Sequence, residues 1–221
     1  MLDLRNKKLA RNLVRYSIKV KQGEKVLIEA KGVDYMLVNE IIKEVYSAGA
    51  FPFVEVTDAR MQRELIMGTS EEHLKRWADY DKYRMMDMDC YIGIRGGDNS
   101  FELSDVPSDK MNAYNKLYSH PVHHEIRVAN TKWVILRYPN PSMSQLAGMS
   151  TEAFEDFYFN VCNLDYAKMD KAMDALKTLM DKTDRVRITA QNTDISFSIK
   201  GLNAVKCSGE CNIPDGEIYT A

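Results

Sequence analysis

The strongest constraint on the fold of this sequence is a strand–helix–strand pattern that begins at residue 25. Lys25–Ala30 and Phe51–Val56 are short runs rich in apolar and β-branched residues, as expected of two strands. The residues between them place apolar side chains at helical spacing, with Asp34 as the expected N-cap and Gly49 as the expected end. That apolar stripe consists of Leu37, Ile41, Ile42 and Val45. A helix that joins consecutive strands in this way indicates a parallel pair with a right-handed crossover.

The alternation of helices and strands continues to about residue 140. Asp89–Ile94 is almost uninterrupted in its apolar character, which is typical of a parallel strand covered on both faces. We therefore predict an α/β fold, an open and mostly parallel sheet with helices on both faces. The segment Gly68-Thr-Ser70 is expected to end one helix and cap the next. The remaining predicted strand is Thr131–Tyr138, and the remaining predicted helices are Leu2–Ile18, Ala59–Met67, Glu71–Met86, Lys110–Leu117, Ser142–Ala147, Thr151–Phe159 and Leu164–Lys182, the last capped by Asp165.

The apolar pattern changes from helical spacing to strict alternation after Thr183. Apolar and polar residues alternate on both sides of a Gln191-Asn-Thr193 turn, which predicts an antiparallel β-hairpin. We expect this change to mark a domain boundary. The prediction is an N-terminal α/β domain at residues 1–183, followed at residues 184–221 by the antiparallel β beginning of a second domain.

Charge and composition exclude several classes of protein. The chain has 30 Lys and Arg against 32 Asp and Glu, so a net charge of -2 gives no electrostatic reason to expect nucleic acid or an anionic membrane as a partner. No stretch is apolar enough for a membrane span, and residues 1–16 lack the apolar core of a signal peptide. Four scattered cysteines do not suit a disulfide framework, so we expect a cytoplasmic protein.

Residues 207–221 hold the strongest candidate for a chemical role. A loop rich in Gly, Asn and Pro places one carboxylate, Glu217, immediately before an apolar–polar–apolar run typical of a strand. Pro214 restricts its own φ and Gly216 permits a positive φ, so the loop can hold the carboxylate in place, as a metal ion requires of its ligand. On the residues alone, an ordinary loop with a solvated glutamate stays the alternative interpretation.

The same segment resembles a known family. Asn212-Ile-Pro-Asp-Gly-Glu-Ile-Tyr-Thr-Ala221 is similar to the N-x-P-x-G-E-[VI]-[FY]-T-[AS] segment of the aminopeptidase T and aminopeptidase S family of metallopeptidases. The resemblance implies that Glu217 is the first ligand of a two-metal site. Further similarity lies in Thr131–Trp133, Tyr138-Pro139, Ala147–Ser150 and Phe154–Phe157, which match the N-terminal domain of the family, and in Thr193–Gly201, which matches the strand leading into its catalytic domain.

The resemblance also implies an activity. The complete enzyme would be a hydrolase that releases N-terminal amino acids from peptides, using a water activated by two divalent ions such as zinc or cobalt. The other ligands in the family (a second Glu, two His, an Asp and a nearby Tyr) lie further along the chain. This sequence is therefore expected to stop just after its first ligand and to lack peptidase activity alone. Its N-terminal domain would restrict access to the site and contribute to a homodimer, with no nucleic acid or membrane as partner.

Two other groups of reactive residues have weaker patterns. His123 and His124, in the segment His120–Glu125, would point to opposite sides of an extended strand, and Pro121 argues against a regular helix, so a metal role there is not favoured. Cys207 and Cys211 have no second pair of cysteines, so we expect thiols beside the loop of Glu217 and not a structural zinc site.

A different class of function stays open for the N-terminal domain. Gly93-Ile-Arg-Gly-Gly97 follows a predicted strand but lacks the G-x-G-x-x-G spacing of dinucleotide-binding proteins. The chain could instead be a stand-alone α/β module that binds a small anionic ligand at the strand ends near Gly96–Ser100, or a dimerisation domain. Asp98 and Glu102 of this loop could meet a substrate amine, although solvated loop acids are the more frequent case.

Overall fold

The computed structural model describes residues 3–33 and 35–221, and the chain divides into two compact units. The first unit extends to Asn163 and includes Glu210–Ile213; the second comprises Leu164–Gly209 and Pro214–Ala221. Within the described residues, no helix combines the length and the apolar character needed to cross a membrane.

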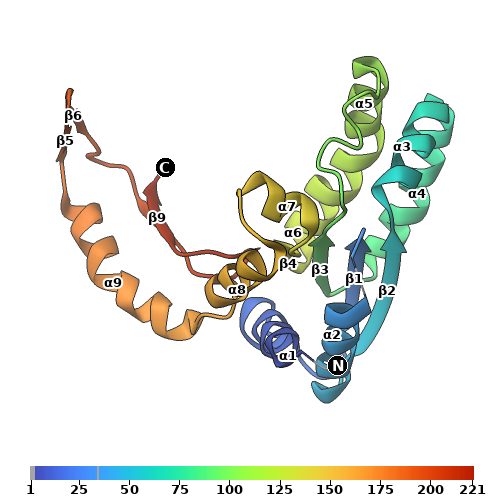
Figure 1. The fold of residues 1–221 in the computed structure, drawn as a ribbon, viewed down its shortest axis with the longest axis horizontal. Helices are drawn as coiled ribbons and strands as arrows, with labels where there is room; N and C mark the ends of the chain where they lie inside the picture. The colour runs from blue at the N-terminus through green and yellow to red at the C-terminus, as the bar shows by residue number, and fades with distance from the viewer. Residues whose placement is uncertain (1–2, 34) are drawn as a thin grey trace. The chain divides into compact units, whose positions relative to one another are not determined.

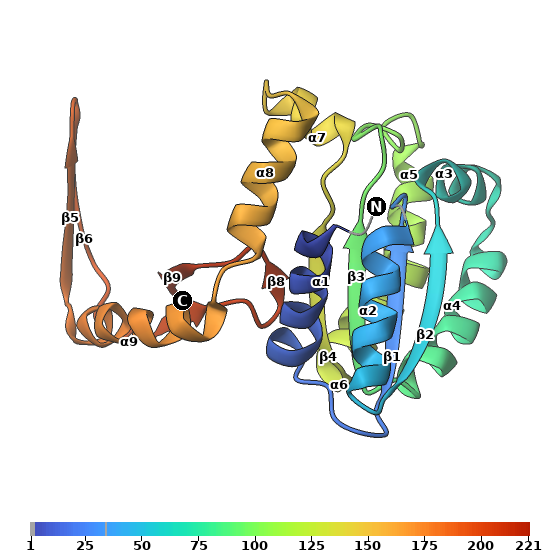
Figure 2. The ribbon, with the colours of Figure 1, turned by 60° about the horizontal axis from the view of Figure 1, so that its bottom comes forward.

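A five-stranded sheet forms the centre of the first unit (Figure 2). Its strands lie in the order β2-β1-β3-β4-β8, and every neighbouring pair is parallel. This confirms the predicted α/β class with a mostly parallel sheet. The strands are β1 (Lys25–Lys31), β2 (Phe51–Thr57), β3 (Cys90–Arg95), β4 (Lys132–Arg137) and β8 (Asn212–Ile213).

Helices cover both faces of this sheet, as predicted (Figure 1). On one face lie α1 (Leu4–Arg11) and α2 (Tyr35–Ser47), while α4 (Glu71–Met86) and the π-helix η2 (Asn115–Arg127) lie on the other. On the second face, Leu27 of β1 and Tyr91 of β3 belong to one buried cluster with Leu74 of α4 and Val122 of η2. Burial on both faces explains why β3 reads as a continuous apolar run. The first unit also contains η1 (Asn12–Ser17), α3 (Ala59–Gly68), α5 (Ser108–Tyr114), α6 (Val128–Asn130), α7 (Pro141–Leu146) and α8 (Thr151–Cys162).

The caps show how the sequence sets helix boundaries. Ser70 accepts a hydrogen bond from the His73 N–H at the start of α4, as the predicted stop-and-cap requires. Asp165 does the same for the Lys168 N–H at the start of α9. The predicted cap Asp34 and the predicted helix start Leu2 lie outside the described residues.

The segment around Pro121 differs from the sequence prediction. It is neither extended nor a regular α-helix, because residues 115–127 form a π-helix with Pro121 inside it. A proline lacks the N–H that a regular helical turn needs, so Pro121 is not compatible with an uninterrupted α-helical hydrogen-bond pattern. In this helix His120 and His124 stack, with ring centroids 5.4 Å apart. An extended strand, with His123 and His124 on opposite sides, is not formed.

The second unit contains one helix and two small antiparallel sheets. The predicted hairpin is confirmed: β5 (Arg185–Ala190) pairs with β6 (Thr193–Ser198) through a turn in which Asn192 has φ 58°. In the other sheet, β7 (Ala204–Cys207) pairs with β9 (Glu217–Thr220). The helix is α9 (Tyr166–Lys182).

The compact units do not follow the boundary predicted at residue 183. The helix α9 belongs to the second unit because its carboxylates hold β7: Lys206 forms ion pairs with Asp170 and Asp174. The chain then returns briefly to the first unit, where the Ile135 N–H donates to the Cys211 carbonyl and β8 pairs with β4. A two-residue strand is too short to show any periodicity, and so β8 was not predicted.

Candidate functional site

Glu217 occupies the first position of β9, so the strand begins one residue earlier than the sequence predicts. In the antiparallel register, Cys207 of β7 lies opposite Glu217, and Lys206 lies opposite Ile218. The Glu217 side chain is exposed, whereas Cys207 is partly buried. The backbone of Glu217 is therefore fixed by the β7–β9 sheet while its carboxylate is open to a ligand.

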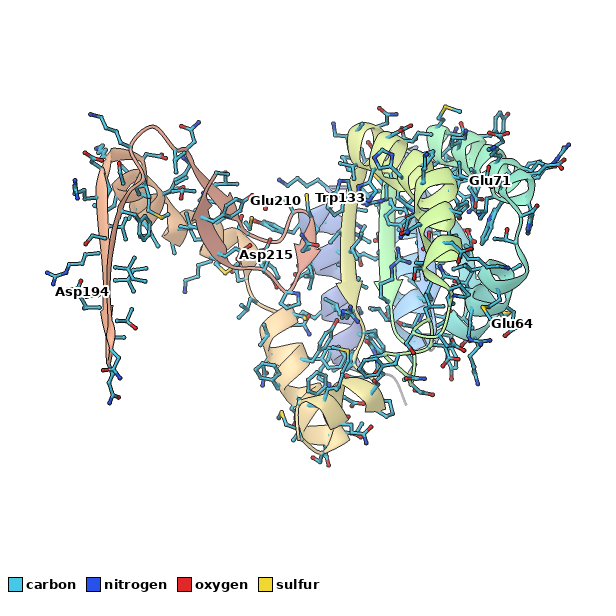
Figure 3. All side chains as sticks on the ribbon, turned by 90° about the horizontal axis from the view of Figure 1, so that it is seen from above. Glu64, Glu71, Trp133, Asp194, Glu210 and Asp215 are labelled. Carbon is cyan, nitrogen blue, oxygen red and sulfur yellow. The ribbon has the colours of Figure 1, made fainter. Side chains whose placement is uncertain are left out.

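Asp215 fixes the loop that precedes Glu217 (Figure 3). Its Oδ2 accepts a hydrogen bond from the Gly209 N–H at 2.8 Å, and its Oδ1 accepts one from the Gly216 N–H at 3.0 Å. The sequence predicts a loop held by Pro214 and Gly216, and Asp215 is a further residue in that role that was not predicted. Aspartate is a frequent turn residue because its carboxylate binds nearby backbone N–H groups, so its position between Pro and Gly was the available signal.

Gly209 also explains the shape of this loop. It has φ 96°, and a Cβ at this position would lie 2.8 Å from the ring of Tyr166. Only glycine satisfies both the positive φ and the close contact. Gly216, at φ 138°, meets the first of these two demands as predicted.

The partner strand β7 is held by the acidic face of α9. The Lys206 Nζ lies 2.8 Å from Asp170 Oδ1 and 2.6 Å from Asp174 Oδ1, and these hydrogen bonds raise the pKa of Lys206. The Ser208 hydroxyl donates to Asp170 at 2.9 Å, and the Ala204 N–H donates to Asp181 at 2.8 Å. These contacts fix the strand that aligns Glu217.

The donor set around Glu217 does not make a metal centre by itself. A zinc or cobalt ion in a protein takes about three or more side-chain ligands. No group of three His, Cys, Asp or Glu suited to an ion occurs in the part of the chain that the structure describes. Glu217 and the thiol of Cys207 therefore offer two possible donors at most.

The histidine-rich segment and the glycine loop are placed as follows. The His120 Nδ1 lies 3.1 Å from the Glu125 carboxylate, and no third donor completes a metal site there among the described residues.

In the loop after β3, Asn99 donates to Glu102 at 3.0 Å, and Ser100 and Ser142 share a hydrogen bond at 2.8 Å. A Cβ on Gly96 would lie 2.5 Å from the Gly32 carbonyl oxygen, so this loop packs tightly on the end of β1.

Comparison with known proteins gives a family and a fold. The sequence model of the thermophilic metalloprotease (M29) family matches residues 3–221. Wild-type AmpT from Thermus thermophilus has a similar structure, with a TM-score of 0.77 and 16% sequence identity over 100% of this chain. The chain spans 62% of the length of that protein. At this identity the match shows a shared fold.

Other comparisons add nothing to this assignment. The CurK enoyl reductase has a TM-score of 0.29 at 9% identity, covering 72% of this chain and 50% of that chain. An alcohol dehydrogenase superfamily protein from Novosphingobium aromaticivorans has a TM-score of 0.31 at 12% identity, covering 89% of this chain and 62% of that chain. Both scores are too low to support an argument. No curated protein sequence matches the chain.

Proposed function

The chain belongs to the thermophilic metalloprotease (M29) family, and from this premise we propose that it forms part of a metal-dependent aminopeptidase that releases N-terminal amino acids from peptides. The observation that carries the proposal is the match over residues 3–221 together with an exposed carboxylate, Glu217, on a backbone fixed by β7 and by Asp215. A ligand held before the ion arrives is what a metal centre requires.

We assign Glu217 as one ligand of a centre of two divalent ions, zinc, cobalt or similar. Because a catalytic ion takes about three protein ligands, Glu217 would share the ions with further donors. The chemistry that such ions supply is a bound water of lowered pKa. The 221-residue chain alone, with Glu217 and at most one thiol beside it, is then expected to bind such ions weakly and to lack peptidase activity.

The first unit would act as a platform for the site and contribute to a homodimer, which remains an inference from the family. A reducing cytoplasm suits the four cysteines, for which the described residues show no disulfide. Peptides are the expected substrates.

The test uses the native gene product, purified with its bound metal, and its Glu217→Gln variant. Amide for carboxylate keeps the size of the side chain but removes the charge that a cation needs. We expect turnover of leucyl-p-nitroanilide to fall by more than the roughly 100-fold that loss of an outer-shell partner costs, and the metal content by elemental analysis to drop.

Glu71→Gln is the matched control, because Glu71 is an exposed glutamate on α4 that pairs with Lys75. It should leave both measurements unchanged. Full metal content and full turnover in Glu217→Gln would remove the assignment of Glu217. Substantial turnover by the 221-residue chain with added zinc or cobalt would show that it carries a complete centre.

A further inference from the structure

A cavity of about 470 Å³ lies inside the first unit, where three parallel strands end. Lys31, Thr57 and Arg95 line it, and they are the last residues of β1, β2 and β3. The register aligns Lys31 with both Thr57 and Arg95. In the sheet, β2 lies on one side of β1 and β3 lies on the other. The cavity therefore lies at the topological switch point, where the strand order changes direction. Open α/β sheets place their ligands at this point, outside the carboxyl ends of the strands.

The carboxylates in this cavity already have cationic partners. Arg95 forms an ion pair with Glu29 and also donates to the Tyr91 hydroxyl at 3.1 Å. Burial would raise the pKa of Glu29, but the charge and hydrogen bond of Arg95, together with the charges of His123 and Lys31, outweigh burial and lower that pKa to about 2. Glu55 forms an ion pair with Arg84 of α4, although burial raises the pKa of Glu55, and Asp58 forms one with Arg60. Each of the three carboxylates that line the cavity therefore already has a cationic partner.

Two cations in the cavity have no such partner. The Lys31 Nζ donates to the neutral amide of Gln62 at 2.7 Å, and among the described residues no carboxylate forms an ion pair with Lys31 or Arg127. Arg127 is only 6% exposed, and its Nε and Nη1 find no acceptor in the described part of the chain. Its guanidinium lies instead over the rings of Trp133, at 4.5 Å, and Tyr91, at 5.1 Å (Trp133 is labelled in Figure 3).

Buried charges without counter-charges are costly, and proteins normally pair them. Burial lowers the pKa of Lys31, and the nearby charge of Arg95 lowers it further. Burial likewise lowers the pKa of His123 to about 4, so this ring is neutral and its Nδ1 is a further polar atom without a partner among the described residues. The polar surface of the cavity therefore presents two cations, Lys31 and Arg127, that form no ion pair with a described carboxylate.

The other wall of the cavity is aromatic and apolar. The ring centroids of Trp77 and Tyr118 are 4.3 Å apart, and those of Tyr118 and Tyr114 are 5.1 Å apart. The side chains of Met61 and Leu65 from α3 complete this wall. A site of this size with an apolar lining and a few convergent polar groups has the features of a small-molecule pocket.

We propose that this cavity binds a small molecule that carries one anionic group, a carboxylate or a phosphate, on an aromatic or apolar body. The anion lies against Lys31 and Arg127, and the body lies against Trp77, Tyr114 and Tyr118. The site is formed entirely by the first unit and needs no metal ion, so it does not depend on the assignment of Glu217. It also differs in its residues from the glycine loop at Gly96–Ser100, where the sequence analysis placed a possible anion site.

Three probes that share one ring but differ in the head group test the proposal. Phenylacetate carries a carboxylate, phenyl phosphate carries a phosphate, and phenylacetamide is neutral. Each is titrated into the 221-residue chain by calorimetry and by tryptophan fluorescence, since Trp77 lines the cavity and Trp133 contacts Arg127. We expect saturable binding of at least one anion and binding at least about tenfold weaker for the amide, as the loss of one charge-assisted contact predicts. The relative affinity of the two anions identifies the natural head group.

Two variants locate the binding. Arg127→Met and Lys31→Met should each weaken binding of the better anion at least about tenfold, while Arg137→Met, which removes an exposed arginine of the same unit, should not change it. If circular dichroism shows that Arg127→Met does not fold, Lys31→Met decides alone. Equal affinity for the amide, no saturable binding of either anion, or unchanged binding in Lys31→Met would each overturn the proposal.

Discussion

The two units of this chain stabilise similar apolar sequences in different ways. In the first unit, Ile28 of β1 and Ile92 of β3 are completely buried between two layers of helices. In the second unit, Ile188 and Ile195 of the β5–β6 hairpin are 50% and 53% exposed. Among the described residues of that unit, the buried apolar side chains are Tyr166, Met173, Ile199 and Ala204.

The difference teaches that a correct strand pattern does not by itself provide a core. An isolated two-stranded hairpin is marginally stable in water, because it has no second layer against which to bury its apolar face. Polar contacts do more of the work in the second unit, chiefly those of Lys206 with α9 and of Asp215 with its own loop. We therefore expect the first unit to unfold cooperatively and the second to open locally.

The largest effect is expected from one substitution made in both units. Ile92→Ala should lower the free energy of unfolding by roughly 4 kcal/mol, because it leaves a cavity in a packed core, whereas Ile195→Ala should change it by less than about 0.5 kcal/mol. Urea denaturation followed by the fluorescence of Trp77 and Trp133, both in the first unit, measures the difference. Equal effects of the two substitutions would break the comparison.

The buried ion pair of the first unit should give the next largest effect. The folded pKa of Glu29 is about 2, below its ordinary value of 4.5, so its stabilising contribution is fully present above about pH 4.5 and is lost as the pH falls toward 2. Glu29→Gln should cost about 3 kcal/mol at neutral pH and remove this part of the acid destabilisation.

His123 adds a second, upper part to that pH series. Its folded pKa of about 4 lies below the ordinary 6.5, so the folded state loses stability as the pH falls from about 6.5 to 4. This upper part of the pH profile should persist in Glu29→Gln and extend to lower pH, because the charge of Glu29 raises the pKa of His123. Urea midpoints measured from pH 7 to pH 2.5 separate the two contributions, and an unchanged lower part in the variant would contradict the assignment to Glu29.

A smaller and local effect is expected in the second unit. Asp215→Ala removes the acceptor for two backbone N–H groups, those of Gly209 and Gly216, at a cost of about 1 kcal/mol each. Amide hydrogen exchange at these two glycines should accelerate, while the urea midpoint of the first unit stays the same. A large shift of that midpoint would show that the units are not separate in stability.

The smallest effect is expected at the tip of the second unit. Arg187 and Asp194 form an exposed ion pair across the hairpin, 2.7 Å apart (Asp194 is labelled in Figure 3). Solvent and salt screen such pairs, so Arg187→Gln should leave the thermal and urea midpoints of the chain unchanged. A measurable shift would mean that the hairpin contributes to a cooperative structure.

The sequence predicts the parts of this molecule that local pattern determines. Strands β1 and β2, the helix between them, and the caps Ser70 and Asp165 follow from spacing and from side-chain chemistry. The pairing of β8 with β4 could not be predicted in this way, because β8 has only two residues and its partner Leu136 is far away in the sequence. The π-helix through Pro121 was missed because a proline ordinarily ends a helix.

The candidate sites divide in the same way. Glu217 stands out in the sequence because turn residues and a strand surround it, and its role as a metal ligand stays a prediction. Lys31, Arg95 and Arg127 were not identified as site residues, because a charged residue at a strand or helix end is usually solvated. Their burial depends on α3, α4 and η2, which come together only in the folded unit. One signal in the sequence could have identified this site. Glu29 and Lys31 place charged side chains near the end of β1, two residues apart and so on the same face of the strand.

The central claim is that the first unit is stabilised by its own core and that the second unit has none. Hydrogen exchange of the 221-residue chain, measured peptide by peptide with mass spectrometry, tests this claim most directly. Peptides of β1 and β3 should exchange only through global unfolding, with a free energy equal to that from urea denaturation. Peptides of β5, β6 and β9 should exchange much earlier, through local opening. Uniform protection across both units, with one common free energy of opening, would contradict the division.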